Sequence, residues 1–289
     1  MAGPSGYPSP AMAAIQVVLV PYDSGRRGER LGAGPLALLE GGVGAALAGA
    51  GHAVEVETIE LEEAFTPEVP AAVELQRGVA AAVRRASAAD RLPVLLAGNC
   101  NLAALGALGG LGSGTAVLWL DAHGDFNTPE TSPSGYFDGM TLAVATGRCF
   151  RGAASGFDGL ETLADERIAL LGVRDLDPPE ERALAASGVT RLAAAELARL
   201  AALLAAWAAA GLRLYLHIDL DVLDPTELVA NLWAVPGGLS RDELADVLDM
   251  VRRTLPPAAI GFTAYGPGYD REARGAGIVA AALDRLLVP

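Results

Sequence analysis

The feature that most limits how this chain can fold is the regular alternation of short apolar runs with longer segments of helical spacing. The runs at residues 15–20, 93–97 and 115–120 are apolar or nearly so, which is typical of strands buried on both faces. Segments such as residues 68–89 and 193–210 repeat their apolar positions with a helical period. Because parallel strands need a crossover, which is usually a helix, this order predicts an α/β fold with a mainly parallel sheet covered by helices on both faces.

The alternation continues along the chain without a break that could serve as a linker. Residues 15–289 are therefore expected to form a single α/β domain. Residues 1–14 are rich in Pro, Gly, Ser and Ala and carry no periodicity. This first segment is expected to be disordered, or to be a remnant of expression.

The composition argues against several classes of partner. The formal net charge of -14 disfavours nucleic acid, because phosphate binding needs a basic surface. No apolar run approaches the length of a membrane span, and no signal sequence stands at the start. The two cysteines, Cys100 and Cys149, are too few for a disulfide framework. These features predict a cytoplasmic protein that acts on a small molecule, without a nucleic-acid or membrane partner.

Polar side chains follow the apolar run at residues 115–120. Asp121, His123 and Asp125 occupy alternate positions there. If the extended geometry of the strand continues, all three side chains point the same way. Two carboxylates and an imidazole on one side of a strand end form a pattern that suits metal ligands.

A second strand carries a similar pair, because Asp219 and Asp221 follow the run at residues 214–218. Carboxylates gathered at two buried strand ends repel each other, at a cost on the order of 4 kcal/mol for each close pair at an effective dielectric constant near 20. Two divalent cations would cancel this charge, and oxygen ligands with one imidazole suit Mn²⁺ while tolerating Fe²⁺, Ni²⁺ or Zn²⁺. The alternative is that the aspartates only cap turns. Two such motifs, each after a hydrophobic strand, favour metal.

These residues resemble the ureohydrolase family, which includes arginase, agmatinase and formimidoylglutamase. Residues 121–129, DAHGDFNTP, are similar to the DAHxDxNTP motif of that family, and residues 219–225, DLDVLDP, to its DxDxxDP motif. The resemblance implies a three-layer αβα sandwich, arginase-like, around a mainly parallel sheet. It also implies a homo-oligomer (a trimer or a hexamer) with two Mn²⁺ ions. The implied reaction is hydrolysis of a linear amidine or guanidino C–N bond by a metal-bridging hydroxide.

The resemblance assigns roles to individual positions. Asp121, His123, Asp125, Asp219 and Asp221 match metal ligands, and Asp125 is also expected to be catalytic. On this pattern, the cation held by Asp121, His123, Asp219 and Asp221 keeps all its ligands. The second cation is the one affected by the departures described below.

Three further positions match substrate contacts in arginase-like members. Asn127 and Ser134 match residues that hold the distal polar end of the substrate, and Asp177 matches one that contacts a substrate amino group. Ordinary loop capping is an equal alternative for Asn127 and Ser134. Asp177 precedes Pro178 and could instead cap a helix.

The chain departs from the family pattern at three positions. Cys100 stands where a metal-binding His is expected, and its thiolate would favour softer ions such as Zn²⁺ or Fe²⁺. The alternative is a small buried thiol that leaves one metal short of a ligand. Asp138 matches the proton-shuttling His, so it is either a catalytic acid or a loop residue that binds backbone. Ala264 matches the Glu that receives the guanidinium, and His217 is expected to be a strand residue beside the core.

The sequence thus predicts a metal-dependent hydrolase of a linear amidine or guanidino C–N bond, with altered substrate recognition. The alternative is a metal-binding homologue that has lost hydrolysis and has a structural or regulatory role.

Overall fold

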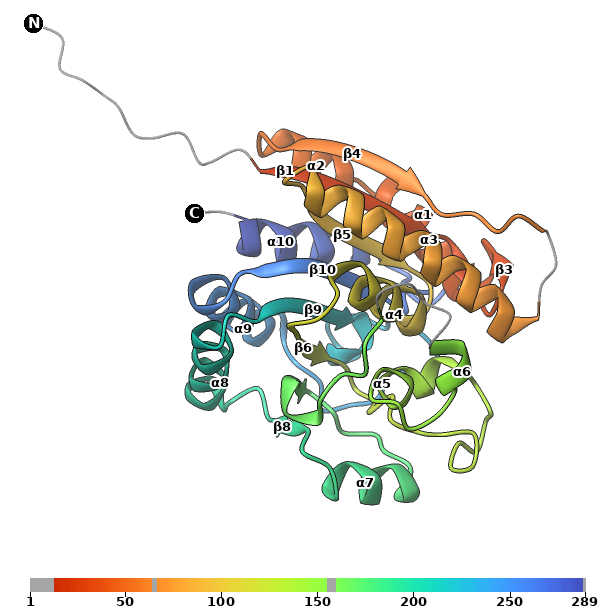
Figure 1. Ribbon diagram of the computed structural model, residues 1–289. Coiled ribbons are helices and arrows are strands. Elements are labelled where there is room, and N and C mark those ends of the chain that lie inside the picture. Colours follow the sequence, from red (N-terminus) through yellow and green to blue (C-terminus); the bar gives the residue numbers. More distant parts are fainter. Residues whose placement is uncertain (1–12, 64–66, 155–159, 288–289) are drawn as a thin grey trace, which may run out of the picture.

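The computed structural model describes residues 13–63, 67–154 and 160–287 (Figure 1). The segment expected to be disordered, residues 1–14, lies outside the described residues except for Ala13 and Ala14. Ala14 is the first residue of strand β1.

An eight-stranded parallel sheet forms the centre of the described part of the chain, with strand order β4-β1-β5-β10-β9-β6-β7-β8. Its strands are β1 (Ala14–Val20), β4 (Ala53–Thr58), β5 (Leu92–Ala97), β6 (Thr115–Leu120), β7 (Ile168–Leu171), β8 (Thr190–Leu192), β9 (Arg213–Asp219) and β10 (Pro257–Thr263). A separate hairpin consists of β2 (Tyr22–Asp23) and β3 (Arg26–Arg27).

Helices cover both faces of the sheet (Figure 1). One face packs against α3 (Glu68–Ala88), α4 (Cys100–Leu111) and α5 (Thr141–Ala145). The other packs against α1 (Gly34–Glu40), α2 (Val43–Gly49), α8 (Leu197–Ala209), α9 (Arg241–Thr254) and α10 (Gly275–Leu287). Two short helices, α6 (Arg151–Ala154) and α7 (Pro178–Ala185), follow β6 and β7 along the chain. The predicted three-layer αβα architecture with a parallel sheet is confirmed.

The continuous apolar runs are explained by this double cover. In β6, Leu118 and Leu120 belong to the core under α8 to α10, while Val117 and Trp119 belong to the core under α3 to α5. Because successive side chains of a strand point to opposite faces, a strand buried on both faces must be apolar at every position.

Two expectations about helices and strands are wrong in detail. Pro35 suits the first turn of a helix, so the sequence predicts a single helix over residues 36–48. The structure has two helices there, because Gly42 has a φ of 106°, a left-handed conformation that ends one helix and starts the next. The long helix expected from residue 193 begins at Leu197, because residues 190–192 form the short edge strand β8.

The segment Arg30–Gly49 corrects the expectation that no apolar run approaches the length of a membrane span. By length and hydropathy it could cross a membrane, although it includes Arg30 and Glu40. In the structure it is divided into a short 3₁₀ turn, α1 and α2, which bury Leu38, Val43 and Leu47 against the sheet.

Candidate metal centre

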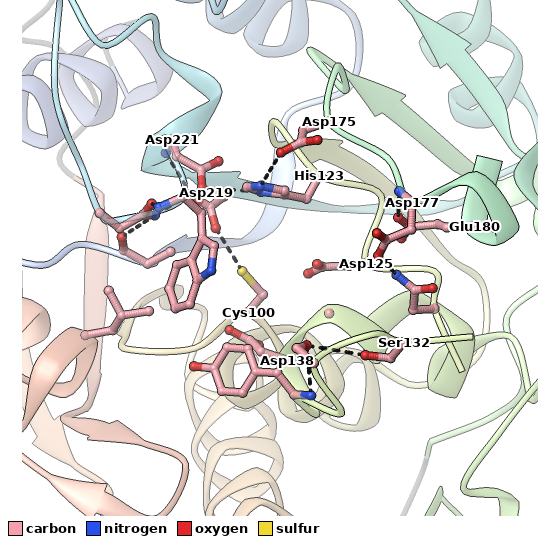
Figure 2. Close-up of a pocket in the computed structure, with 18 residues that line it drawn as sticks. Cys100, His123, Asp125, Ser132, Asp138, Asp175, Asp177, Glu180, Asp219 and Asp221 are labelled. Carbon is pink, nitrogen blue, oxygen red and sulfur yellow. Dashed lines mark hydrogen bonds and ion pairs between the residues drawn. The ribbon is translucent and has the colours of Figure 1, made fainter. Parts of the chain in front are cut away.

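The two acidic motifs meet at one edge of the sheet. β6 and β9 are neighbours, and their carboxyl ends are aligned, with Leu120 opposite Ile218. Open parallel sheets bind ligands at this edge. Asp121, Asp125, Asp219 and Asp221 are all buried there, with at most 7% of any one residue exposed. The predicted convergence of the two motifs is confirmed (Figure 2).

The way in which the first motif converges differs from the prediction. β6 ends at Leu120, so the extended geometry does not continue through Asp121, His123 and Asp125. Asp125 instead adopts a φ of 47°, and its carbonyl accepts a hydrogen bond from Leu142 N at 2.8 Å. A loop that is fixed by tertiary contacts, rather than the strand pleat, therefore aims these side chains.

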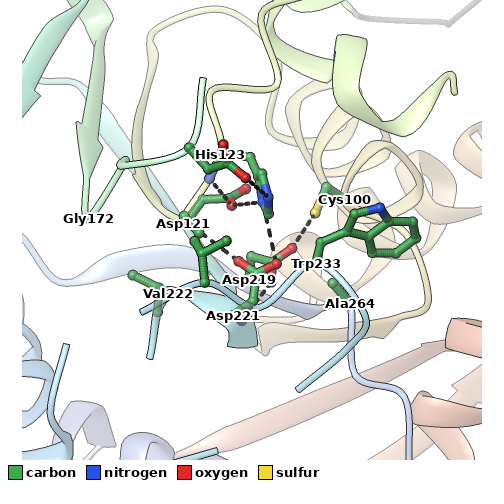
Figure 3. A network of polar contacts seen from close by, with 12 residues as sticks. Cys100, Asp121, His123, Gly172, Asp219, Asp221, Val222, Trp233 and Ala264 are labelled. Carbon is green, nitrogen blue, oxygen red and sulfur yellow. Dashed lines mark hydrogen bonds and ion pairs between the residues drawn. The ribbon is translucent and has the colours of Figure 1, made fainter. Parts of the chain in front are cut away.

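His123 lies between two carboxylates (Figure 3). Its Nδ1 is 3.3 Å from Asp121 Oδ1 and 3.4 Å from Asp221 Oδ2. Burial alone lowers the pKa of His123, but hydrogen bonds to these two carboxylates raise it to about 12. For the acid Asp121, burial has the opposite effect and raises the pKa to about 6, and the nearby charge of Asp221 raises it further. This cluster therefore attracts positive charge strongly.

The second motif is held by backbone and amide donors. Asp219 Oδ1 accepts a hydrogen bond from Asp221 N at 2.8 Å, which folds the chain into a 3₁₀ turn directly after β9. Asp221 Oδ1 accepts from Ala122 N at 3.3 Å, and its Oδ2 accepts from Asn231 Nδ2 at 3.0 Å. These bonds fix both carboxylates in place.

Cys100 is the first residue of α4, and its side chain points toward the second motif (Figure 3). Its Sγ donates to Asp219 Oδ2 at 3.1 Å and lies 3.2 Å from Thr263 Oγ1. Burial raises the pKa of the Cys100 thiol well above its usual value, and the charge of Asp219 raises it further. A thiol that touches Asp219 is close enough to share a cation with it.

One carboxylate oxygen in the centre lacks a hydrogen-bond partner in the part of the chain that the structure describes. Asp125 Oδ2 is buried and forms no hydrogen bond among the described residues. Burial raises the pKa of Asp125 well above its usual value, and the charges of Asp121 and Asp138 contribute. An orphaned carboxylate oxygen, aimed into a cavity beside other carboxylates, fits a cation that supplies the missing partner.

The donor set as a whole fits divalent cations. Ligand atoms of Asp121, His123 and Asp221 all lie within 4.8 Å of one another. Cys100 and Asp121 form a second such group with the buried ring of His217. Oxygen, imidazole and thiolate ligands together suit first-row divalent metals.

A cavity of about 280 Å³ opens above these residues (Figure 2). All the predicted site residues except Asp121, which is 1% exposed, line it. The predicted residues that line the cavity are Cys100, His123, Asp125, Asn127, Ser134, Asp138, Asp177, Asp219 and Asp221.

The three predicted substrate contacts lie at the cavity wall, but each also has a structural partner. Asn127 Nδ2 donates to Asp177 Oδ2 at 3.0 Å. Asp177 forms a capping box with Glu180 at the start of α7. Ser134 is exposed at the mouth, where its Oγ accepts from Tyr136 N at 3.2 Å. Capping and cavity lining are thus combined in the same residues.

Asp138 is buried opposite the metal-binding motifs. Its Oδ1 accepts from Asn101 N at 2.8 Å and Asn101 Nδ2 at 2.9 Å, and its Oδ2 accepts from Asn99 Nδ2 at 3.0 Å. Burial raises the pKa of Asp138 to about 7, in spite of these donors, which lower it. Asp138 therefore both anchors the start of α4 and presents a carboxyl group to the cavity.

Several lining residues were not identified from the sequence. Asp175 lies 3.9 Å from His123 Nε2, and Glu180 Oε1 accepts from Phe126 N at 2.8 Å. Tyr136 and Trp233 stack at the cavity, with ring centroids 5.7 Å apart. Trp233 could have been found from its place in the loop after the second motif. Asp175 and Glu180 could have been found from their place after β7, at the same edge of the sheet.

The comparisons with known proteins agree with this geometry. The model of the arginase family matches residues 13–288. The chain belongs to the arginase family. Members of this family are metal-dependent hydrolases of C–N bonds in linear amidines.

Among curated relatives, the N(omega)-hydroxy-L-arginine amidinohydrolase of Streptomyces lavendulae is 32% identical over 203 residues, which are 70% of this chain and 71% of that protein. An arginase of Bacillus caldovelox is 28% identical over 294 residues, 95% of this chain and 98% of that protein. The solved structure of the Bacillus caldovelox arginase superposes with a TM-score of 0.85, at 28% identity, and covers 96% of this chain and 98% of that chain. Formimidoylglutamase from Bacillus subtilis shares the arginase fold, with a TM-score of 0.74 at 18% identity over 96% of this chain and 87% of that chain.

The third aspartate of the second motif has a structural role. Asp224 Oδ1 accepts from Thr226 N and Oγ1 at 3.0 and 2.7 Å, and its Oδ2 accepts from Gly237 N and Gly238 N at 2.7 and 3.2 Å. These bonds, the Thr226 hydroxyl first among them, lower the pKa of Asp224 to about 2. Asp224 thus closes the loop that carries Asn231 and Trp233.

We expect Asp224→Ala to lower the free energy of unfolding by about 1 kcal/mol at pH 7, a modest value because solvent screens this carboxylate. The folded pKa is below the unfolded value, so this stability is present above about pH 4 and is lost as the pH falls toward 2. Urea denaturation at pH 7 and pH 3 measures the difference, and Asp246→Ala on α9 is the exposed control. An equal difference between wild type and Asp224→Ala at both pH values would contradict this account.

Proposed function

We propose that this arginase-family protein hydrolyses the terminal guanidino or N-hydroxyguanidino group of a small amino acid. The observation that carries the proposal is the convergence of four buried aspartates, Asp121, Asp125, Asp219 and Asp221, at a cavity that all but Asp121 line. Within the described part of the chain, Asp125 Oδ2 has no hydrogen-bond partner there. Such an arrangement of like charges is costly unless a cation joins it.

The residues present would hold two divalent cations, which we propose to be Mn²⁺. Asp121, His123, Asp219 and Asp221 would hold one, and Asp121, Asp219, Asp125 and Cys100 the other. When bound, divalent cations supply an activated water near neutral pH. Softer metals are favoured at the second position if the thiolate is a ligand.

The acidic wall of the cavity supports a substrate with an ammonium group. Asp175 lies beside His123, 3.9 Å from its Nε2, and Asp177 and Glu180 lie together farther along the same wall (Figure 2). We propose that Asp177 binds the amino group of the substrate, while Asn127 and Ser134 contact its carboxylate end. A small polar cavity of this size suits an amino acid rather than a polymer.

The reaction adds water across the amidine carbon. The bond from that carbon to the substituted nitrogen breaks, urea or hydroxyurea leaves with the carbonyl oxygen, and the amine product takes up a proton. We propose that Asp125 orients the attacking water. Asp138 lies across the cavity from Asp219, and we assign it the transfer of a proton to the departing amine.

Ala264 supports a hydroxylated amidine. It lines the cavity beside Cys100 and Trp233, where its methyl group replaces the carboxylate that resemblance to the family leads us to expect (Figure 3). Loss of this charge weakens the attraction for a fully cationic guanidinium, and the smaller side chain leaves space. An N-hydroxyl group makes a guanidine bulkier and less basic, and the Streptomyces lavendulae relative is named for such a substrate.

A substrate panel tests the proposal with protein loaded with Mn²⁺. We expect hydroxyurea release from N(omega)-hydroxy-L-arginine with kcat/KM at least about tenfold above that for urea release from arginine, agmatine or guanidinobutyrate, which corresponds to about 1.4 kcal/mol. Formimidoylglutamate and guanidine complete the panel. No turnover of any amidine at full metal loading would contradict the proposal and would indicate a homologue with a structural or regulatory role.

Cys100→His tests the second cation position separately. We expect this change to raise Mn²⁺ occupancy severalfold, because imidazole suits Mn²⁺ better than thiolate does. Metal content of protein purified without chelator, together with calorimetric titration, measures the effect. Unchanged occupancy and affinity would place Cys100 outside the coordination sphere.

A further inference from the structure

A line of buried polar side chains lies beneath Cys100, on the face of the sheet that α4 covers. Tyr215 and His217 are on β9, and Thr263 is the last residue of β10. The register pairs His217 with Gly261, and Asp219 with Thr263. None of the three polar residues is more than 1% exposed. Buried polar groups of this kind need hydrogen-bond partners.

These residues form one continuous chain of hydrogen bonds that ends at the sulfur. The Tyr215 hydroxyl is 3.0 Å from His217 Nδ1, and His217 Nε2 is 3.1 Å from Thr263 Oγ1. Thr263 Oγ1 is in turn 3.2 Å from Cys100 Sγ, which donates to Asp219 Oδ2 at 3.1 Å. The chain thus connects a buried phenol to two of the residues that would hold a cation.

The direction of the hydrogen bonds follows from the first residue. Among the described residues, the Tyr215 hydroxyl contacts no acceptor other than His217 Nδ1, so its proton must be donated there. His217 then carries its proton on Nε2 and donates it to Thr263 Oγ1. The Thr263 hydroxyl is left free to donate to Cys100 Sγ. This series of hydrogen bonds therefore makes the Thr263 hydroxyl a hydrogen-bond donor to the Cys100 sulfur.

The local packing fixes this arrangement. The His217 ring stacks on its cross-strand neighbour Trp119, with centroids 3.5 Å apart and planes 9° apart. Trp119 Nε1 donates to Asp121 Oδ2 at 2.9 Å. A β-carbon at Gly261 would lie 2.4 Å from the Tyr215 hydroxyl, so only glycine leaves room for it. The same stack orients groups in both acidic motifs.

We propose that Tyr215, His217 and Thr263 are positioning residues that hold Cys100 as a thiolate ligand of the second cation. This inference rests on the metal centre of the proposed function. A hydrogen bond from Thr263 to the sulfur fixes the direction of its lone pairs, as outer partners of metal ligands commonly do. A ring nitrogen of His217 lies within 4.8 Å of ligand atoms of Cys100 and Asp121. Both ring nitrogens are engaged in hydrogen bonds, however, so His217 is not itself a ligand.

Cobalt binding to the full-length, chelator-treated protein tests the inference through the absorption of the thiolate–Co²⁺ bond. We expect wild type to show a thiolate-to-cobalt charge-transfer band that Cys100→Ser abolishes. Thr263→Val, which keeps the shape but removes the hydroxyl, should weaken the band and lower Co²⁺ affinity about 10- to 100-fold. Thr263→Ser should restore both. Thr115→Val removes a buried hydroxyl at the start of β6, far from the centre, and should leave both unchanged.

Tyr215→Phe is the second variant, and it serves if Thr263→Val does not fold. It removes the hydrogen bond from the Tyr215 hydroxyl to His217 Nδ1, at the end of the hydrogen-bond series farthest from Cys100. We expect a severalfold loss of Co²⁺ affinity and a shift of the charge-transfer band. Wild-type affinity and spectrum in the folded variants would overturn the inference, and so would a wild-type protein that binds Co²⁺ without a thiolate band. Hydroxyurea and urea release by the Mn²⁺ protein reports the proposed function separately, because hydrolysis does not require sulfur ligation.

Discussion

Asp219→Asn is expected to lower kcat/KM for the best amidine substrate by at least about 10³-fold, equivalent to about 4 kcal/mol of transition-state stabilisation. Asp219 Oδ2 contacts Cys100 Sγ, and its Oδ1 contacts the backbone of Asp221. The carboxylate is therefore within reach of both proposed cation positions. An amide is a weaker ligand and carries no charge, so both cations should be lost or misplaced.

Steady-state kinetics and metal content, measured on the same preparations, check this result. Asp246→Asn removes one exposed charge from α9 and is the matched control. It should retain wild-type kinetics and metal content. If Asp219→Asn keeps its metal and loses less than about tenfold in kcat/KM, Asp219 does not belong to the centre.

Removal of metal should lower the melting temperature of wild type by about 5–16 °C. Ligand at 100 to 1,000 times its dissociation constant stabilises a folded protein by about 2.7–4.1 kcal/mol, and each kcal/mol shifts the melting temperature of a protein of this size by about 2–4 °C. The stabilisation is expected at this centre because the buried carboxylates repel each other when no cation is bound, and a bound cation relieves that repulsion.

Asp219→Asn should change the melting temperature both without metal and with Mn²⁺. Without metal it should melt above wild type, because one source of like-charge repulsion has been removed. With Mn²⁺ it should gain little. Scanning calorimetry in chelator and in excess Mn²⁺ compares the two proteins. Equal Mn²⁺-dependent shifts in wild type and variant would mean that the cation binds elsewhere.

The sequence was sufficient for the parallel α/β fold and for the acidic edge. Uninterrupted apolar runs such as that of β6 arise only where both faces of a strand are covered, and they showed where the strands end. Carboxylates placed just after two such strands could be brought together without knowledge of any loop. The metal-binding motifs were therefore the most predictable part of the site.

Loop conformation and distant partners were not predictable. The φ of 47° at Asp125 is held by contacts to residues of α5 and α7, which are remote in sequence. β8 is a three-residue strand, identified only by its pairing with β7. The polar chain beneath Cys100 depends on the register between β9 and β10, which no local pattern encodes. Each of these features is produced by tertiary contacts.

The most direct test of the metal centre measures amidine hydrolysis as Mn²⁺ is added stepwise to chelator-treated protein, with bound metal determined at each step. We predict no turnover of N(omega)-hydroxy-L-arginine without metal, and turnover that rises with occupancy and saturates when the centre is filled. Turnover that is the same with and without bound metal, or a fully loaded protein that hydrolyses no amidine, would contradict the account.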